Sequence, residues 1–181
     1  MAEKYPDTLW EIPQPNTNKN KEAPKEKLIA LTIDDAPSAY TLDILHLLQK
    51  YNARATFFLI GSQIPGREGI LHTLVKSGME LGNHAMHDEP SVSLGKGVLE
   101  QEMQEVEGGV IGWAGVNAWH VRSLVREGSI VVMHDRRSWT VEGLRRVLPV
   151  LRDRGFRVVG LGEAMGIVDA ANAAVSGDLI D

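Results

Sequence analysis

The sequence predicts a single α/β domain built on a parallel sheet or barrel, with helices on the outside. Short apolar runs rich in β-branched and aromatic residues alternate with segments whose apolar residues recur at helical spacing. Such alternation favours parallel strands joined by helical crossovers. The length of 181 residues fits one domain, and 43% hydrophobic residues suffice for its core.

Composition excludes several classes of function. The formal charge of -5 gives no basis for a nucleic-acid-binding surface, and the absence of cysteine excludes disulfides, thiolate metal sites and a cysteine nucleophile. No apolar run approaches the roughly 20 residues of a membrane span. The first ten residues lack the apolar core of a secretion signal. We therefore expect no nucleic-acid or membrane partner and, by default, a cytoplasmic location. Nothing in the sequence sets the oligomeric state.

The chain is expected to divide into an extended N-terminal arm, residues 1–27, and one domain, residues 28–181. The arm is polar, and its four prolines exclude a regular helix or strand. Trp10 and Ile12 are candidate anchors of the arm on the domain, and a loose tail is the alternative.

The first half of the chain carries the clearest strand signals. The run 28–33 consists of six mostly apolar residues and leads directly into two aspartates, and the run 55–60 is equally β-favouring. Between them, leucines at helical spacing predict a helix over 41–51 with Thr41 as its N-cap. The other elements expected here are helix 67–77, strand 79–82 and helix 98–107.

In the second half, the glycine-rich stretch 108–116 predicts no regular element. Thr140 is the candidate N-cap of a helix over 141–154, in which Pro149 predicts a kink or a late start. The remaining expected elements are helix 117–127, strands 129–133 and 156–160, and a short helix 162–167 followed by an alanine-rich tail.

Acidic and imidazole side chains follow three of the five expected strands. They are Asp34-Asp35, then His84 with His87 and Asp88, then His134-Asp135. Parallel strands bring their carboxyl ends to one edge, where ligands bind in such folds. Two carboxylates at the edge of a core are costly unless they are solvated, paired or bound to a metal. The topology therefore predicts one shared site.

These side-chain types together can perform hydrolysis. A carboxylate and one or two imidazoles can hold a divalent metal with an open position for water, and a second carboxylate can accept a proton from that water. A separate histidine can donate a proton to the leaving group. Metal, base and acid in one site suit hydrolysis of an unreactive acyl bond.

Four segments resemble the polysaccharide deacetylases, the NodB-homology family of carbohydrate esterases. The segment Thr32-Ile33-Asp34-Asp35-Ala36-Pro37 is similar to the family's Thr-Phe-Asp-Asp-Gly-Pro motif. Residues 55–61, 82–84 and 130–135 are similar to its second strand, the start of its metal motif and its last motif. The matches follow the family's order, and the spelling of residues 83–90 looks most like fungal chitin deacetylase-like proteins.

The resemblance implies a metal-dependent, chitin-type deacetylase acting on a non-peptide C–N bond of N-acetylated carbohydrate. Asp34 would be the general base and His134 the general acid. Asp35 and His84 would bind the metal, with Zn²⁺ or Co²⁺ expected. The register of the family's His-x-x-x-His motif indicates Asp88 as the third ligand, whereas ligand type favours His87.

The chain departs from the family in length. At roughly 30 residues per βα unit it holds about five units, whereas a barrel needs seven or eight. An Arg-Pro-Pro-like segment that orients the base and an Asp-Trp-like segment that partners the acid are both missing, and 108–116 stands in their place. We therefore expect an incomplete or distorted (β/α) barrel of the NodB type, internally shortened near 108–116. Ala36 replaces the usual glycine, which matters only if that residue needs a positive φ.

Other interpretations remain open at this point. The chain could be a non-catalytic homologue that binds metal or sugar, an aspartate-dependent phosphotransferase, or a structural fragment. The aspartates are adjacent rather than spaced as Asp-x-Asp, and no glycine-rich phosphate loop is present, which argues against the phosphotransferase. Arg136 and Arg137 are interpreted as solvated charges, and His46 and His72 as residues without a ligand role.

Overall fold

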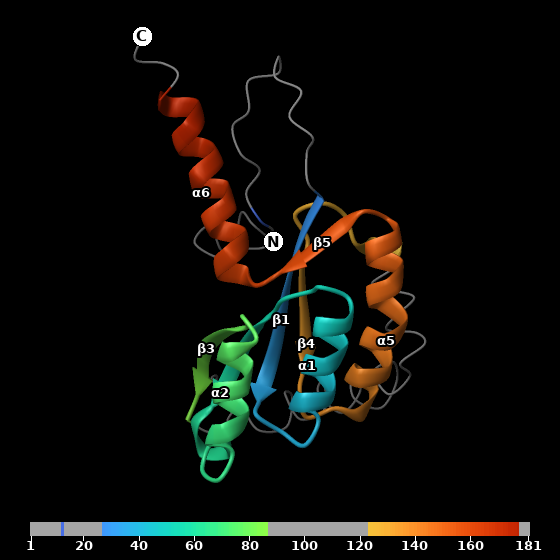
Figure 1. The fold of residues 1–181 in the computed structure, drawn as a ribbon, viewed down its shortest axis with the longest axis vertical. Coiled ribbons are helices and arrows are strands. Elements are labelled where there is room, and N and C mark those ends of the chain that lie inside the picture. The colour runs from blue at the N-terminus through green and yellow to red at the C-terminus, as the bar shows by residue number, and fades with distance from the viewer. Residues whose placement is uncertain (1–11, 13–26, 87–122, 178–181) are drawn as a thin grey trace, which may run out of the picture.

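The computed structural model of the chain describes residues 12, 27–86 and 123–177 (Figure 1). Strands and helices alternate through both described segments, which confirms the predicted α/β class. The elements are β1 (Lys27–Ala36), α1 (Thr41–Lys50), β2 (Thr56–Ile60), the 3₁₀ turn η1 (Gly61–Gln63), α2 (Glu68–Lys76), β3 (Glu80–Ala85), β4 (Ile130–His134), α5 (Ser138–Asp153), β5 (Phe156–Val159) and α6 (Leu161–Gly177). Among the helices described, none is long and apolar enough to cross a membrane.

β1 is the central strand of a five-stranded parallel sheet. The order along the sheet is β3-β2-β1-β4, and β5 also pairs with β1. β2 pairs with residues 32–36 of β1, β4 with residues 30–34, and β5 with residues 27–30. Within the described part of the chain, β3 and β4 do not pair with each other, so these five strands form an open sheet rather than a closed ring.

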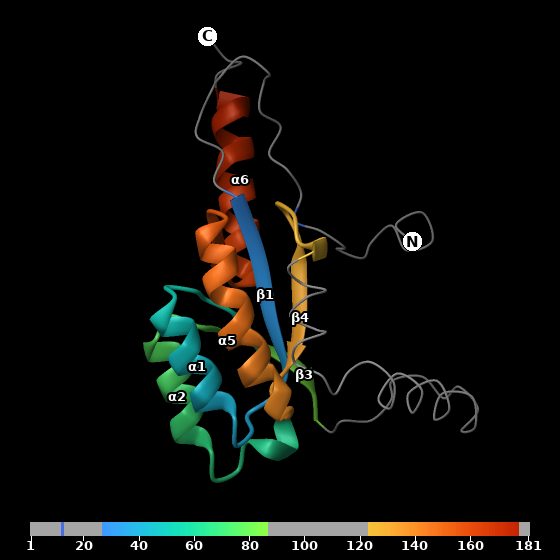
Figure 2. The same cartoon turned by 90° about the vertical axis from the view of Figure 1, so that its right-hand side faces the viewer.

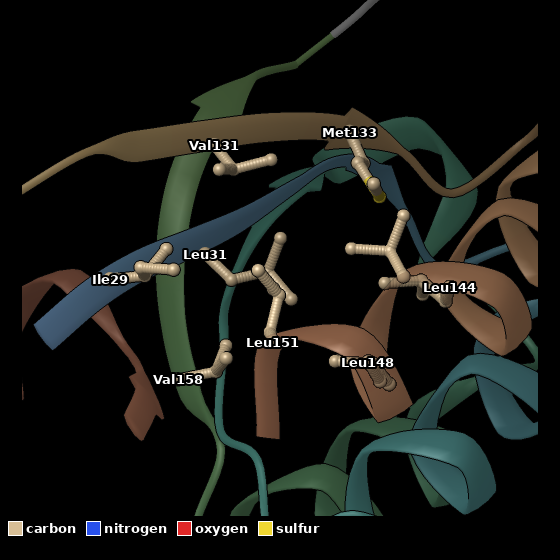
Figure 3. Close-up of a pocket in the computed structure, with 9 residues that line it drawn as sticks. Ile29, Leu31, Val131, Met133, Leu144, Leu148, Leu151 and Val158 are labelled. Carbon is tan, nitrogen blue, oxygen red and sulfur yellow. The ribbon is translucent and has the colours of Figure 1, made fainter. Parts of the chain in front are cut away.

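Helices α1, α2 and α5 cover one face of the sheet, as Figure 2 shows. Alternate residues of β1, namely Ile29, Leu31 and Ile33, are buried against them. Figure 3 shows leucines of α5 facing side chains of β1 and β4 around a small apolar cavity. Full burial of one aliphatic side chain contributes roughly 1.5–3 kcal/mol, so this layer holds the sheet rigid from one side.

A smaller apolar cluster covers the other face of β1 near its amino end. Leu28 and Ala30 pack there against Val159 and against Ala164 and Val168 of α6. Ile12 completes the cluster, only 2% exposed, and its N–H donates to the carbonyl of Gly128 at 2.8 Å. This contact confirms Ile12 as an anchor of the arm, whereas Trp10 lies outside the described residues.

The start of α6 is fastened to the start of β3 by the Glu80 carboxylate. The N–H groups of Gly162 and Glu163 donate to its two oxygens at 2.8 and 2.6 Å. The Thr56 hydroxyl donates to Glu80 at 2.5 Å and accepts the Leu161 N–H at 2.8 Å. A carboxylate at a helix N-terminus accepts hydrogen bonds from the free N–H groups and interacts favourably with the positive end of the helix dipole. These bonds seat α6 at the amino ends of the strands.

Several predicted helix boundaries are wrong. α6 continues to Gly177 rather than ending near 167, because the alanine-rich tail has high helix propensity. α5 begins at Ser138 and continues through Pro149, since its buried leucines and valine outweigh one lost backbone bond. The helix expected over 117–127 ends earlier, because residues 125–128 are not helical and Gly128 turns with φ 84°. Helix 98–107 and the stretch 108–116 lie outside the described residues.

The predicted N-caps are also wrong. Tyr40 and Arg137 occupy those positions, and neither makes a capping bond through its side chain. Thr41 and Thr140 lie inside their helices, and their hydroxyls bond instead to the strand-end segment of β4. The caps were misplaced because these hydroxyls have tertiary partners that local sequence does not show.

Replacing Glu80 with alanine should lower the free energy of unfolding by about 1–2 kcal/mol, the usual cost of a lost helix cap. The N–H groups of Gly162 and Glu163 lose their acceptor in this variant. Glu80→Gln, which keeps an acceptor oxygen, should lose less. Urea denaturation measures the free energy of unfolding of both variants. A Glu80→Ala variant as stable as the parent would contradict the capping role.

Candidate active site

The predicted site residues Asp34, Asp35, His84 and His134 meet at the carboxyl ends of β1, β3 and β4. Asp34 is the direct register partner of His134, so the two side chains project from adjacent strands on the same face of the sheet. The prediction that distant strand ends converge on one site is confirmed for these residues. His87 and Asp88 lie outside the described residues.

Two irregularities in the strands shape this edge. Between Ile33 and Ala36, β1 carries one residue more than β2, and Asp35 adopts a positive φ of 64°. β3 has a similar extra residue at His84, because Asn83 and Ala85 pair with consecutive residues of β2. A bulge breaks the alternation of side chains and redirects one of them.

The bulges bring Asp35 and His84 together from strands that are not neighbours. Nε2 of His84 lies 3.5 Å from Oδ1 of Asp35 and 4.0 Å from Oδ2 of Asp34. Asp35 is only 5% exposed, whereas the His84 side chain is 39% exposed. The left-handed residue is Asp35 and not Ala36, so the replacement of the usual glycine by Ala36 imposes no backbone strain.

Arg136 contributes a cation that the sequence interpretation missed. Its Nε lies 3.9 Å from Oδ2 of Asp35, so the interpretation of Arg136 as a simply solvated charge is wrong. Arg137 instead lies over the ring of Trp139, at 5.5 Å from the ring centre. Nothing in the local sequence distinguishes these two arginines. Only the pairing of β4 with β1 places Arg136 beside the buried carboxylate.

Burial and charge act in opposite directions on Asp34. Partial burial is the strongest influence and raises the pKa of its carboxyl above the ordinary 3.8, and the neighbouring Asp35 carboxylate raises it further. Positive charge on His84 and on His134 lowers it. The net result is a raised pKa, which makes Asp34 a better proton acceptor than an ordinary surface aspartate.

Asp135 was predicted to share the site with the other strand-end side chains, but it is buried and bonds to the segment after β1. It is fully buried, and burial raises the pKa of its carboxyl. Its Oδ2 accepts bonds from the Ser38 N–H and the Thr41 hydroxyl, and Oδ1 is buried without a hydrogen-bond partner among the described residues. The available signal was its position directly after an apolar strand, where a buried acidic side chain needs a partner.

Asp35 and His84 fit a divalent metal. A carboxylate oxygen and an imidazole nitrogen 3.5 Å apart, on a buried and an exposed side chain, are suitable donors for Zn²⁺ or Co²⁺. No cluster of three or more acidic or histidine ligands occurs among the residues that the structure describes. The third ligand thus remains a prediction at His87 or Asp88.

Comparison with known proteins identifies related chains. A model of the polysaccharide deacetylase family matches residues 21–124. A peptidoglycan-N-acetylglucosamine deacetylase of Bacillus cereus is 30% identical over 86% of this chain and 92% of the relative. The match runs over 205 positions, more than the 181 residues of this chain, so it contains gaps on this chain's side.

Solved structures share the fold. The peptidoglycan deacetylase PdaC from Bacillus subtilis superposes with a TM-score of 0.70 at 20% identity, covering 88% of this chain and 100% of that one. A family 4 acetyl xylan esterase from Clostridium thermocellum, solved with a cobalt ion, gives a TM-score of 0.65 at 26% identity over 78% of this chain and 91% of that one.

Loss of either described metal donor should weaken metal binding. We expect Asp35→Asn and His84→Gln each to lower Zn²⁺ affinity by more than about tenfold, because removal of a group that merely supports a ligand already costs roughly 10–100-fold. Calorimetric titration of the metal-free protein measures this. His72→Gln is the matched control, since His72 is exposed on α2. Unchanged affinity in both site variants would disprove the ligand assignment.

Asp135→Asn should change how stability depends on pH. The pKa of Asp135 is raised above 3.8 in the folded protein, so this group adds stability below pH 3.8 that is lost as pH rises through the raised pKa. Asparagine does not titrate. The parent should therefore lose stability relative to the variant as pH rises from about 4 through the raised pKa of Asp135. Urea denaturation at several pH values tests this, and a constant difference would contradict it.

Proposed function

This chain belongs to the polysaccharide deacetylase family, and we propose that it is a metal-dependent hydrolase that removes N-acetyl groups from N-acetylglucosamine units of a polysaccharide. The observation that carries the proposal is the meeting of Asp34, Asp35, His84 and His134 at one edge of the sheet. That set contains a base, an acid and two metal donors, which are the groups that amide hydrolysis requires.

Asp34 is the proposed base. Water adds to the acetamide carbonyl carbon, and Asp34 accepts the proton that water loses. Oδ2 of Asp34 lies 4.0 Å from Nε2 of His84, whereas Oδ1 of Asp35 lies 3.5 Å from the same nitrogen. Asp34 is therefore beside the two proposed metal donors and is not one of them. The raised pKa of Asp34 favours proton transfer near neutral pH.

His134 is the proposed acid. When the C–N bond breaks, the sugar nitrogen needs a proton to leave as an amine, and acetate is the second product. His134 projects from the strand next to Asp34, and its exposed side chain can reach a bound sugar. Base and acid thus come from paired residues of β1 and β4, on one face of the sheet.

Asp35 and His84 are the proposed metal ligands, with His87 or Asp88 as the third. When bound, a divalent ion there supplies Lewis-acid polarisation of the carbonyl and of the attacking water. Nε of Arg136 lies 3.9 Å from Oδ2 of Asp35, so a positive charge faces the buried carboxylate.

The proposed substrate is a polysaccharide that contains β-linked N-acetylglucosamine units. Chitin and peptidoglycan both contain this unit. The Bacillus cereus relative is named as a deacetylase of peptidoglycan. The resemblance to chitin deacetylase-like proteins favours the first. Comparing acetate release from chito-oligomers and from purified peptidoglycan distinguishes the two sources.

A non-catalytic homologue that binds metal or sugar is the second candidate. The observation in its favour is the absence from the sequence of the two segments that orient base and acid in the resembling family. Loss of one oxyanion donor alone can reduce the rate by roughly 10²–10³. Calorimetric binding of Zn²⁺ and chito-oligomers, without acetate release, would favour this candidate.

We expect the parent chain, loaded with Zn²⁺ or Co²⁺, to release acetate from N-acetylglucosamine oligomers. Asp34→Asn and His134→Gln should each reduce kcat by about 10²–10⁴, the usual contribution of general acid–base catalysis. Asp43→Asn, an exposed aspartate of α1, is the matched control and should retain full activity.

A folded, metal-loaded parent that releases no acetate from either polymer would refute the catalytic proposal. Parental activity in Asp34→Asn would refute the base assignment while leaving the reaction intact.

A further inference from the structure

We propose that Asp135 is a positioning residue, which acts by clamping the segment after Asp34 onto the segment after His134 and so fixes the base relative to the acid. The inference rests on the proposed function, because it concerns how the two reacting side chains of that reaction are held. Asp135 itself is fully buried and therefore does not touch a substrate bound at the exposed edge.

The clamp joins two segments far apart in the sequence. Oδ2 of Asp135 accepts the Ser38 N–H at 2.9 Å and the Thr41 hydroxyl at 2.5 Å, across 97 and 94 residues. The Thr41 hydroxyl also lies 3.1 Å from the Ser38 carbonyl, but it has one hydrogen, and the shorter contact identifies Asp135 as its acceptor. The single Ser38 N–H is shared between Oδ2 of Asp135 and the Thr41 oxygen, which lies 2.7 Å from the Ser38 nitrogen.

The backbone of Asp135 adds two further bonds to the same segment. Its N–H donates to the carbonyl of Asp34 at 2.7 Å, and its carbonyl accepts the Ser38 hydroxyl at 3.2 Å. The neighbouring His134 carbonyl accepts the Thr140 hydroxyl at 2.7 Å, which holds the segment against α5. Hydrogen bonds therefore join the end of β4 to the end of β1, to the segment that follows β1 and to α5.

The clamp lies one residue beyond the pair that reacts. β1 and β4 end at this edge, and the ladder between them ends with Asp34 opposite His134. Without a tie beyond the last pair, two strand ends separate more easily than strand interiors. Misplacement of a reacting group by about 1 Å can cost roughly 10²-fold in rate. The Asp135 carboxylate supplies that tie.

The bonding pattern indicates which property of Asp135 matters. One oxygen accepts both bonds and the other is buried without a partner among the described residues. A single acceptor oxygen at this position is therefore sufficient, and asparagine can supply it. Ionisation strengthens the two bonds, since charge-assisted hydrogen bonds are roughly twice as strong as neutral ones.

The test compares acetate release by Asp135→Ala, Asp135→Asn and Thr41→Val, each loaded with Zn²⁺, using chito-oligomers as substrate. Asp135→Ala should lower kcat by about 10- to 100-fold with KM changed less than about threefold, because the displaced groups react but do not bind the sugar. Asp135→Asn should restore kcat to within about threefold of the parent. Asp153→Ala, an exposed aspartate at the end of α5, is the matched control.

Thr41→Val keeps the side-chain volume and removes the hydroxyl that donates to Asp135 and accepts from the Ser38 N–H, so the inference remains testable if Asp135→Ala fails to fold. We expect a kcat reduced by about three- to tenfold at a temperature where the variant is fully folded. Thermal unfolding of every variant sets that temperature, since a merely structural role would lower Tm and leave kcat of the folded enzyme unchanged.

Each outcome has a distinct meaning. Parental kcat in folded Asp135→Ala, or in folded Thr41→Val if the first variant does not fold, overturns the positioning role and leaves the deacetylase function standing. An Asp135→Asn variant as slow as Asp135→Ala also overturns it, because the charge and not the hydrogen bonds would then matter. A parent chain that releases no acetate overturns the proposed function, and with it the role of Asp135.

Discussion

The pairing of β1 with its neighbours is the constraint on which the site depends. β1 is the one described strand that contacts three others, and its ladder with β4 places Asp34 opposite His134. A shift of that ladder by one residue would turn one of these side chains to the helix-covered face. The apolar alternation of Ile29, Leu31 and Ile33 against the helices prevents such a shift. The same core contacts that stabilise the domain therefore also hold the proposed base, Asp34, opposite the proposed acid, His134.

The site uses two departures from regular strand geometry to gather its charges. A regular ladder would separate the side chains of β1 and β3 by the width of β2. The extra residues at Asp35 and at His84 redirect both side chains to one point, where they lie 3.5 Å apart. A buried carboxylate is costly, and His84 and Arg136 offset that cost from two sides. A metal at this point would replace weak ion pairs by direct coordination, which supports the proposal of Asp35 as a ligand rather than as a base.

Periodicity predicted the strands and the convergence of their ends because both follow from apolar pattern and parallel topology. Periodicity did not predict the bulges, because a strand with one extra residue has the same apolar pattern in a single sequence as a regular strand. His84 was therefore expected beyond a strand ending at residue 82, whereas β3 continues to Ala85. The roles of Asp135, Thr41 and Arg136 depend on contacts between segments about a hundred residues apart. Local propensity instead placed Thr41 as a helix cap, although its hydroxyl has a stronger partner elsewhere.

The site consists of two halves that share β1, and the two halves depend on different parts of the chain. The proposed metal half, Asp35 with His84, is built by β1, β2 and β3, which follow one another directly in the sequence. The proposed proton-transfer half, Asp34 with His134, is built by β1 and β4, and the segment that the sequence indicates to be shortened lies between these two strands. Among the described residues, the proposed acid is positioned through the pairing of β4 with β1. A tie at the very end of the β1–β4 ladder therefore matters to the proposal, because the sequence lacks the two segments that orient base and acid in the resembling family. The buried carboxylate of Asp135 occupies that position beside the proposed acid, and its hydrogen bonds to the segment after β1 offset part of the cost of burying it.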